Sequence, residues 1–449
     1  MRGLRNIFTR EEGGLHGAAF LLGVSSLASG VLALVRDRIF AHTLGAGSEL
    51  DIYYASFRIP DFLFVTVASF VSMTVLIPIL IKKMDGKSVV STERAADFLA
   101  EVLTVFCFVM AVVSVALFVA MPWLSYLVAP GFGEAARAEF VHLARILLLS
   151  PFLLGVSNLL GSVTQSLRRF AVYALAPLVY NLGIILGALF LYPYYGLTGL
   201  VMGVILGALL HGAIQLPTVR GAGFSLRLAR SINWTEMREV IRLSLPRTAG
   251  LGMSQLVILV LIALASYMKE GSIAIFNFAL NLQSVPLSIV GVSYSVAAFP
   301  KLSEHIGKGE RGAFVRHVLL ARRQITLFSL PLLLGGILLR KQLVYLLLGT
   351  GQFSVADTAL TADALGLFLI SLWAQGLLLL YTRSYYAAGE TRKPVIANAF
   401  ASVVTILLAV VLVQAYGTVL ALPLAFSIGM ILNVCLHWRS FSRDFGTVT

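Results

Sequence analysis

Long runs of hydrophobic positions, separated by short polar stretches, dominate this chain. A run such as 103–119 is apolar on nearly every face. A helix needs about 20 consecutive apolar residues to cross a bilayer, whereas a transmembrane strand shows about ten residues of alternating polarity. The pattern therefore predicts membrane-spanning helices.

Twelve runs can be distinguished, and we expect each to form one transmembrane helix. The predicted spans cover residues 15–35, 60–81, 97–121, 139–164, 171–192, 197–218, 243–267, 274–299, 317–339, 362–386, 394–414 and 418–437. The predicted fold class is an all-α polytopic membrane protein.

Composition agrees with this prediction. Hydrophobic residues make up 58% of the chain and charged residues 12%, against about 45–50% apolar usage in soluble domains. The excess of 34 Lys and Arg over 21 Asp and Glu would suggest nucleic-acid binding in a soluble protein, but basic residues also hold loops of membrane proteins in the cytoplasm. We expect no nucleic-acid partner.

The basic residues concentrate in alternate loops. They are Lys82, Lys83, Lys87 and Arg94; Arg168 and Arg169; Arg220, Arg227, Arg230, Arg238 and Arg242; Lys301, Lys308, Arg311, Arg316, Arg322 and Arg323; and Arg383, Arg392 and Lys393. Most intervening loops carry less charge, although the loop after the first span is an exception. The pattern predicts that both termini are cytoplasmic.

An internal repeat divides the chain. Pro177 and Asn181, near the start of the fifth predicted span, recur as Pro394 and Asn398, 217 positions later. We therefore expect a six-helix lobe at 1–219, a basic cytoplasmic linker at 220–242 and a second six-helix lobe at 243–449. Because six is even, both lobes keep one orientation, which is typical of transporters that bind substrate between two parallel repeats.

Charged residues interrupt the apolar pattern early in the chain, at Arg36, Asp37, Asp51 and Arg58. A charge at membrane depth costs at least about 2.5–3.5 kcal/mol unless it faces a cavity or a partner. Arg36 and Asp37 could simply pair at a helix end and extend to the interface. Arg58, at the mouth of the second span, is the better candidate, because guanidinium groups bind phosphate and pyrophosphate through two hydrogen bonds.

Three polar residues are candidates in the second half. Arg247 begins a helix rich in small residues, which permits close packing or an open cavity, although it could also be a cytoplasmic anchor. Asn281 and Gln283 interrupt the eighth span. Buried amides need hydrogen-bond partners, and these two could join helices as easily as contact substrate.

Enzyme chemistry has little support in the sequence. No paired carboxylates, Ser/His/Asp order, metal-spaced His cluster or phosphate-binding loop stands on an exposed segment. The chain is therefore predicted to be a transporter, with no cofactor and no metal. No Asp or Glu lies in the middle of a second-half span, so the driving force stays open; membrane potential acting on an anionic substrate is one candidate.

Several motifs carry a resemblance to a known family. They are Val31-Leu32-Ala33-Leu34-Val35-Arg36-Asp37, Leu44-Gly45-Ala46-Gly47, Asp51, Ser56-Phe57-Arg58-Ile59-Pro60, Ala298-Phe299-Pro300, Gly351-Gln352-Phe353 and Thr391-Arg392-Lys393-Pro394. With these motifs the chain resembles the MurJ (MviN) family of lipid II flippases, members of the multidrug/oligosaccharidyl-lipid/polysaccharide exporter (MOP) superfamily.

The resemblance implies two six-helix lobes around a central cationic cavity, and alternating access that moves lipid II to the outer leaflet during peptidoglycan biosynthesis. Arg36, Asp37, Asp51 and Arg58 stand where the family keeps matching or similar polar residues. The implied partners are undecaprenyl-pyrophosphate-linked precursor or a similar anionic lipid, membrane lipids and proteins of cell-wall synthesis.

The chain also departs from the family pattern. Some members carry an arginine at the position of Gly30, and an arginine is usual at that of Asn281. Phe64 and Val65 replace a double arginine, and Ser69 replaces a glutamate. We hypothesise that Arg247 restores the positive charge missing at Asn281. The family also has two further spans that form a groove for the lipid tail, which puts tail handling in this chain in doubt.

Three alternatives remain at the level of sequence. An exporter of another lipid-linked polysaccharide unit or amphipathic compound would share the fold, but an exporter of cationic drugs should line its cavity with acidic residues. A membrane-embedded enzyme would need a catalytic carboxylate with a partner motif. A noncatalytic scaffold for cell-wall machinery would keep the arginines without transport.

Overall fold

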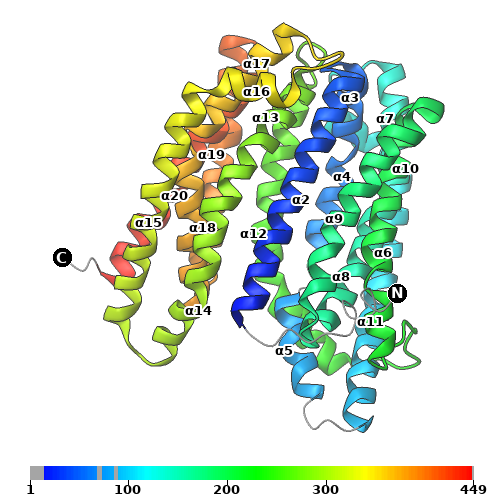
Figure 1. The fold of residues 1–449 in the computed structure, drawn as a ribbon, viewed down its shortest axis with the longest axis vertical. Coiled ribbons are helices and arrows are strands. Elements are labelled where there is room, and N and C mark those ends of the chain that lie inside the picture. Colours follow the sequence, from blue (N-terminus) through cyan, green and yellow to red (C-terminus); the bar gives the residue numbers. More distant parts are fainter. Residues whose placement is uncertain (1–14, 68–72, 85–88, 447–449) are drawn as a thin grey trace. The chain divides into compact units, whose positions relative to one another are not determined.

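The computed structural model describes residues 15–67, 73–84 and 89–446, without the side chains of 15–20, 73–74, 89–91, 243, 245–247 and 249–251. All regular elements in these ranges are helical (Figure 1). The predicted all-α class is therefore confirmed.

The count of twelve spans is not confirmed. Among the described residues, seven helices are long and apolar enough to cross a membrane, or up to eight if a bent pair forms one span. Two of the differences have plain causes. The stretch Phe170–Gly221 counts as one although Gly196 interrupts it with φ 55° and ψ −141°, and part of the predicted second span lies outside the described residues.

The chain forms two compact units. The first contains Met1–Ile39, Ser56–Leu127 and Glu134–Gly252, and the second contains Phe40–Ala55, Val128–Gly133 and Met253–Thr449. These units differ from the predicted lobes, because residues 40–55 and 128–133 belong to the second unit although they come from the first half of the chain.

The elements of the first unit are mainly consecutive. They are α2 (Leu15–Leu44, up to residue 39), α4 (Arg58–Val67), α5 (Met73–Met84), α6 (Val89–Val128), α7 (Glu134–Leu147), α8 (Leu149–Ser166), α9 (Phe170–Leu186), the π-helical turn η2 (Gly187–Leu191), α10 (Tyr192–Ala213), α11 (Leu216–Gly221) and the first part of α12 (Trp234–Ala265). Helix thus extends into both ends of the predicted linker at 220–242.

The second unit begins with the end of α2 and the short helix α3. Its elements are α3 (Ser48–Ser56), the end of α12, α13 (Ser272–Leu287), the π-helical turn η3 (Ser288–Val292), α14 (Ser293–Gly307), α15 (Arg311–Leu338), α16 (Arg340–Leu348), α17 (Val355–Leu369), α18 (Leu372–Ala387), α19 (Arg392–Tyr416) and α20 (Ala421–Phe445). Within this unit, α15, α18, α20 and α19 follow one another side by side (Figure 1).

Glycines allow α9 and α10 to pack closely in the first unit. Gly183 and Gly187 face Gly207 and Gly203, and a Cβ atom on any of the four would collide with backbone of the opposite helix. Spacing of four residues puts glycines on one helix face. Close backbone approach through small residues is a common way of joining helices in lipid, where hydrophobic burial contributes little.

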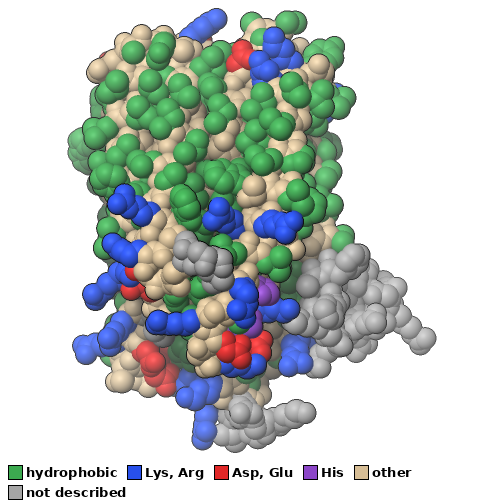
Figure 2. Space-filling model, turned by 90° about the vertical axis from the view of Figure 1, so that its left-hand side faces the viewer, with side chains coloured by type: hydrophobic (Ala, Val, Ile, Leu, Met, Phe, Trp, Pro, Cys, Tyr) green, Lys and Arg blue, Asp and Glu red, His purple; other side chains and the backbone are tan. Residues whose placement is uncertain are grey.

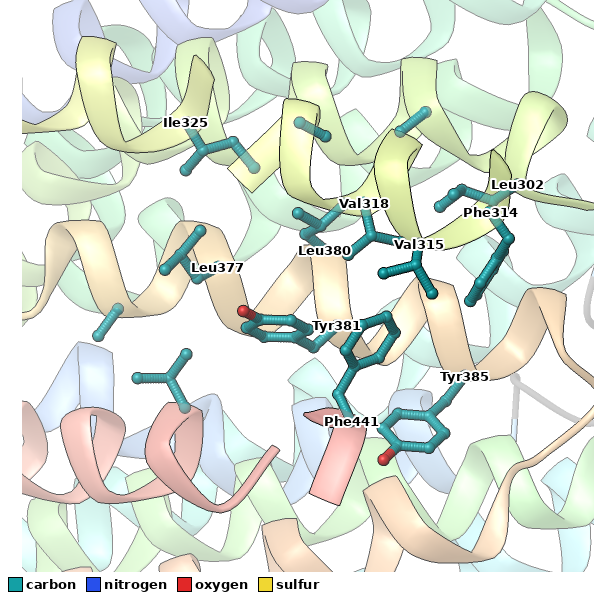
Figure 3. Close-up of a cluster of buried hydrophobic side chains, with 14 of the residues drawn as sticks. Leu302, Phe314, Val315, Val318, Ile325, Leu377, Leu380, Tyr381, Tyr385 and Phe441 are labelled. Atoms are coloured by element: carbon teal, nitrogen blue, oxygen red, sulfur yellow. The ribbon is translucent and has the colours of Figure 1, made fainter. Parts of the chain in front are cut away.

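Aromatic packing forms a core in the second unit (Figure 3). Phe441 of α20 lies between Phe314 of α15 and two tyrosines of α18, Tyr381 and Tyr385, with ring centroids 5.5–6.2 Å from its own. All four side chains are buried. Edge and tilted contacts of this kind contribute beyond the buried area alone, so this cluster fixes one end of the three helices.

The predicted tenth span is bent. Helices α17 and α18 meet at an angle of 43°. The Ser371 N–H donates to Phe368 O at 3.1 Å, one residue short of the α-helical partner. The freed carbonyl of Leu367 accepts instead from the Ser427 hydroxyl of α20 at 2.7 Å, so a side chain from a neighbouring helix stabilises the bend.

Charged and apolar side chains occupy different parts of the face in Figure 2. Hydrophobic side chains cover much of the upper part, while Lys and Arg side chains gather mainly in the lower part. Helices α6, α15 and α19 carry many exposed apolar residues, including Phe108, Leu327 and Leu407. A broad apolar surface of this extent suits a lipid environment.

Candidate functional site

Arg36 and Asp37 form an ion pair near the end of α2, within the first unit. The Arg36 guanidinium donates to Asp37 Oδ1 from Nε at 3.0 Å and from the terminal nitrogen NH2 at 2.7 Å. The Asp37 side chain is only 2% exposed, whereas that of Arg36 is 19% exposed. The carboxylate therefore orients the arginine and leaves part of the guanidinium accessible.

Arg58 is the first residue of α4 and is half-buried in the same unit. Asp61, one turn later, interacts electrostatically with Arg58. Tyr180 of α9 in turn interacts with Asp61 and Arg36. These electrostatic interactions connect polar side chains of α2, α4 and α9, which we call the arginine cluster: Arg36, Asp37, Arg58, Asp61 and Tyr180.

The described arginine cluster contains as many carboxylates as guanidinium groups. Two arginines stand beside two aspartates, so the formal charges cancel when all four are ionised. Sequence reasoning expected a cationic site, and the balance results from Asp61, which that reasoning did not count among the site residues. Proximity of Asp61 to Arg58 could be anticipated from their spacing, because residues three apart share a helix face.

Three positions that depart from the family pattern lie in the two helices that carry the arginines of this cluster, α2 and α4. Phe64 and Val65 are half-buried in α4. Gly30 of α2 has open space around it, with no heavy atom within 4 Å of an added Cβ. Alanine therefore fits at Gly30 without displacing any described neighbour.

Arg247 lies within α12, but its side chain is outside the described part of the structure. Its backbone belongs to the first unit, as do Arg36 and Arg58. The role predicted for Arg247 as a compensating charge stays a hypothesis.

Asp51 lies in the second unit, in the short helix α3. Its carboxylate accepts hydrogen bonds from Gly271 N and Ala274 N, both at 2.7 Å. These N–H groups stand at the start of α13, where a helix leaves its first donors without partners in the helix. Asp51 therefore caps α13 from 220 residues away, and its negative charge also suits the positive end of the helix dipole.

Glycines allow the backbone segments around Asp51 to pack closely. Gly45, Gly271 and Gly351 have φ values of 64°, 88° and 60°, a backbone region that glycine adopts without strain. A Cβ on Gly271 would collide with Ala46 O, and one on Gly351 with His42 O. We call this group of segments the cap junction: residues 42–51, 271–274 and 350–353.

The cap junction brings two separate family motifs into contact. Gln352 N donates to His42 O at 3.0 Å, and the His42 ring nitrogen Nδ1 lies 3.0 Å from Thr350 Oγ1. Phe353 then packs edge-on against Phe278 of α13, with centroids 5.5 Å apart. The motifs at 44–47 and 351–353 are thus parts of one structure, which their separation in sequence concealed.

Burial changes the acidity of Asp51. Desolvation raises the pKa of the carboxyl from 3.8 to about 7, although hydrogen bonds from Ala274 N and Gly271 N lower it. Neighbouring Glu270 raises it further. The carboxyl therefore changes protonation near neutral pH.

Gln283 and Asn281 occupy different surroundings on α13. Gln283 is buried, and its Oε1 accepts from Gln375 Nε2 of α18 at 3.1 Å. Gln375 also donates to Ser371 Oγ at 2.9 Å, at the bend between α17 and α18. Asn281 is half-buried, two residues away. Gln283 therefore joins helices, while a substrate contact by either amide stays a prediction.

The candidate residues thus fall into separate groups. Arg36, Asp37 and Arg58 share the arginine cluster of the first unit, whereas Asp51 lies in the cap junction and Gln283 beside the bent span. Within the described residues, no group of three or more His, Cys, Asp and Glu side chains is arranged to hold a metal ion.

A family model and curated relatives match most of the chain. The model for "Lipid II flippase MurJ" matches residues 40–448. The probable lipid II flippase MurJ of Thermotoga maritima is 29% identical over 436 residues, covering 95% of this chain and 85% of that protein. The protein of the same description from Vibrio cholerae is 28% identical over 438 residues, covering 94% and 82%.

Solved structures share the fold. A structure described as lipid II flippase MurJ in the inward closed conformation matches with a TM-score of 0.81 and 23% identity, covering 95% of this chain and 89% of that one. An inward-facing multidrug resistance MATE transporter of the MOP superfamily matches with a TM-score of 0.75 and 16% identity, covering 94% of each. The fold is therefore that of the MOP superfamily.

Proposed function

The chain belongs to the family of the lipid II flippase MurJ, and from this premise we propose that it moves a lipid-linked peptidoglycan precursor from the inner to the outer leaflet by alternating access. The observation that carries the proposal is the family match over residues 40–448, nearly the whole chain. The substrate is then lipid II or a similar undecaprenyl-pyrophosphate-linked anionic lipid.

The arginine cluster supports recognition of the pyrophosphate. Arg58 begins α4, so its guanidinium charge adds to the positive end of the helix dipole. Arg36 is held by Asp37 and presents a partly exposed guanidinium. Arginine is suited to this role, because its planar fork donates two parallel hydrogen bonds to a phosphate group.

The two carboxylates give the cluster a second function in this proposal. Asp37 and Asp61 neutralise the arginines when no substrate is bound, so that two guanidinium groups can lie close together in a poorly solvated site. Binding of a pyrophosphate then changes the partners of the arginines. We include Arg247 as a third headgroup contact. Asp51, Asn281 and Gln283 stay predicted substrate contacts of the second unit.

Orientation follows from the distribution of basic loops. With Lys and Arg loops in the cytoplasm, both termini are cytoplasmic and the chain resides in the inner membrane. Translocation of an anionic headgroup outward is favoured by a membrane potential that is negative inside, by about 2.3 kcal/mol per charge at 100 mV. Cell-wall synthesis proteins are the partners we expect to supply and receive the precursor.

A second transport function has a specific observation in its favour. Gly30, Phe64 and Val65 lack the charges that family members carry at these positions, and the described arginine cluster is balanced in formal charge. Such a site also suits a lipid-linked polysaccharide unit with a single phosphate, or another amphipathic compound. A scaffold would keep the arginines without transporting a lipid.

Depletion of the resident lipid II flippase in a bacterial host that expresses this chain tests the proposal. Lipid II in the outer leaflet is scored with an externally added toxin that cleaves the precursor. We expect rescue by the natural chain and its loss with Arg58→Ala. Arg227→Ala is the matched control, because Arg227 is exposed and pairs with Asp97 outside the cluster.

The outcomes separate the alternatives. Loss of rescue with Arg58→Ala but not with Arg227→Ala supports a flippase that acts through the arginine cluster. Failure of a well-expressed, membrane-inserted natural chain contradicts lipid II transport and favours the polysaccharide-unit exporter. The scaffold is favoured if both the natural chain and Arg58→Ala rescue growth while no lipid II becomes accessible to the toxin.

A further inference from the structure

A shallow pocket in the first unit lies outside the arginine cluster. Its volume is about 360 Å³, and its lining consists of Phe118 from α6 and Ala138, Val141, His142, Arg145 and Ile146 from α7. The five α7 residues recur at spacings of three and four, which places them on one helix face. The pocket is thus a feature of the surface between two helices, and we call it the α6/α7 pocket.

The pocket lies near the ends of two predicted spans. Phe118 lies three residues before the end of the predicted span 97–121, and Arg145 lies six residues after the start of the predicted span 139–164, or about 5 Å and about 9 Å of helix from those ends. The hydrocarbon core of a bilayer is about 30 Å thick. By these predicted spans, Arg145 is a charged residue just inside the hydrocarbon core, where charges without a function are rare.

A proline explains how Arg145 is held. Pro122 lies within α6 and has no N–H, so the carbonyl of Phe118 lacks its usual helical donor. Arg145 Nε donates to that oxygen at 3.0 Å. The guanidinium carbon also lies 4.5 Å from the centre of the Phe118 ring, a favourable cation–π distance. The side chain is thus fixed at the pocket by two contacts.

These contacts leave much of the guanidinium's capacity unused. An arginine carries five N–H donors, and the Phe118 carbonyl takes one of them. No carboxylate lies in the pocket lining, and among the described ion pairs none includes Arg145. A neutral donor could satisfy the Phe118 carbonyl equally well. The positive charge of Arg145 at this depth is therefore better explained by an anionic ligand.

The surroundings suit a lipid. His142 lies in the pocket lining, and its Nε2 is 3.3 Å from Thr198 Oγ1. Toward the end of α6, Trp123 and Tyr126 are 69% and 60% exposed, and Arg137 stacks over Tyr126 at 3.9 Å. Exposed Trp and Tyr near a helix end are typical of the membrane interface, which indicates that this face of α6 and α7 contacts the bilayer.

We propose that the α6/α7 pocket binds the phosphate of an anionic membrane phospholipid, with Arg145 as its charged ligand and the exposed apolar face of α6 against an acyl chain. An anionic headgroup is favoured over a zwitterionic one, because the pocket lining offers no carboxylate for an ammonium group. In the proposed orientation the lipid belongs to the outer leaflet. The site is separate from the substrate site, and its occupancy does not depend on transport.

Native mass spectrometry of the full chain, released from phosphatidylglycerol and phosphatidylcholine nanodiscs, tests this proposal by counting retained lipids. We expect the natural chain to retain one phosphatidylglycerol in preference to phosphatidylcholine. Arg145→Gln should weaken retention about tenfold, which corresponds to the loss of one charge-assisted contact. Arg137→Gln is the matched control, because it removes the same charge from the same helix outside the pocket.

A second variant separates binding from folding. Ala138→Trp fills the pocket while it leaves Arg145 and the charge unchanged, and it should lower retention as Arg145→Gln does, with both proteins keeping the thermal unfolding midpoint of the natural chain within a few degrees. Equal retention of both lipids, or equal losses for Arg137→Gln and Arg145→Gln, would overturn the proposal in favour of unspecific attraction. Unchanged retention in Ala138→Trp would overturn the assignment to this pocket.

Discussion

The arginine cluster and the cap junction both arise from the motif segment between residues 36 and 58, yet they are built in opposite ways. In the arginine cluster, a carboxylate meets a guanidinium that stays 19% exposed. In the cap junction, a buried carboxylate meets two backbone N–H groups, and glycines exclude any side chain between the segments. The same motif segment therefore supplies a partly exposed ion pair, Arg36 with Asp37, and a buried carboxylate, Asp51, whose partners are fixed.

The difference distinguishes two reasons for a charged residue in a membrane protein. A helix-capping carboxylate such as Asp51 is needed for the fold, because removing it leaves buried donors without an acceptor. An arginine such as Arg58 costs stability unless it has a partner, and in our proposal its partner is a ligand. Substitutions in the cap junction should therefore change stability first, and substitutions in the arginine cluster should change transport first.

Asp51→Ala should have the largest effect on stability. It leaves two buried N–H groups at the start of α13 without an acceptor, which we expect to cost about 3 kcal/mol. Thermal unfolding of the purified protein in detergent measures this change. Asp51→Asn keeps one acceptor oxygen and should cost less; equal stability of Asp51→Ala and the natural chain would contradict the capping role.

Gly271→Ala should cost about 2 kcal/mol, because the substitution adds a backbone collision with Ala46 to the strain of a positive φ. Gly389→Ala is the matched control, since Gly389 has a φ of 74° but open space around it. We expect only about 1 kcal/mol there. The same unfolding assay compares the two, and equal losses would show that contact across the cap junction contributes nothing.

Arg58→Ala should show the opposite behaviour. Loss of charge-assisted hydrogen bonds to a pyrophosphate should lower transport about tenfold, while the unfolding midpoint stays near that of the natural chain. Lipid flipping per folded protein provides the measurement, with Arg58→Lys as a variant that keeps the charge and loses the planar fork. If Arg58→Ala lowers the stability enough to explain all of the lost transport, Arg58 is a structural residue and the proposed role is wrong.

A further effect concerns pH. Because burial raises the Asp51 pKa from 3.8 to about 7, the folded protein binds a proton that the unfolded chain releases between these values. Stability from this group should therefore fall as the pH rises from about 4 to 7 and then level off. Unfolding midpoints at pH 5 and pH 8 test this, and the midpoint of Asp51→Asn should depend less on pH. A midpoint of the natural chain that rises with pH, and a loss of that rise in Asp51→Asn, would contradict the raised pKa of Asp51.

Sequence patterns predicted the helical class and the family because both depend on local information. Apolar runs mark helices wherever lipid surrounds them, and the motif around Arg36 and Asp37 is continuous in the chain. The pairing of these two neighbours was also among the alternatives considered, and the structure shows that pair.

Long-range contacts were beyond the reach of the sequence. The partners of Asp51 are 220 and 223 positions away, and nothing in its own segment indicates that it caps α13. The bend between α17 and α18 depends on Ser427 of α20, so no pattern within the tenth predicted span revealed it. Pairing of Gln283 with Gln375 likewise joins two spans that the sequence left unconnected.

Transport of lipid II by the purified chain tests the central claim most directly. The natural chain and Arg58→Ala are reconstituted into liposomes with fluorescent lipid II, and the fraction protected from an external quencher is followed over time. The account predicts rapid flipping by the natural chain, about tenfold slower flipping with Arg58→Ala, and little movement of an undecaprenyl-phosphate-linked polysaccharide unit. Lipid II that stays in its original leaflet while the polysaccharide unit moves would contradict it.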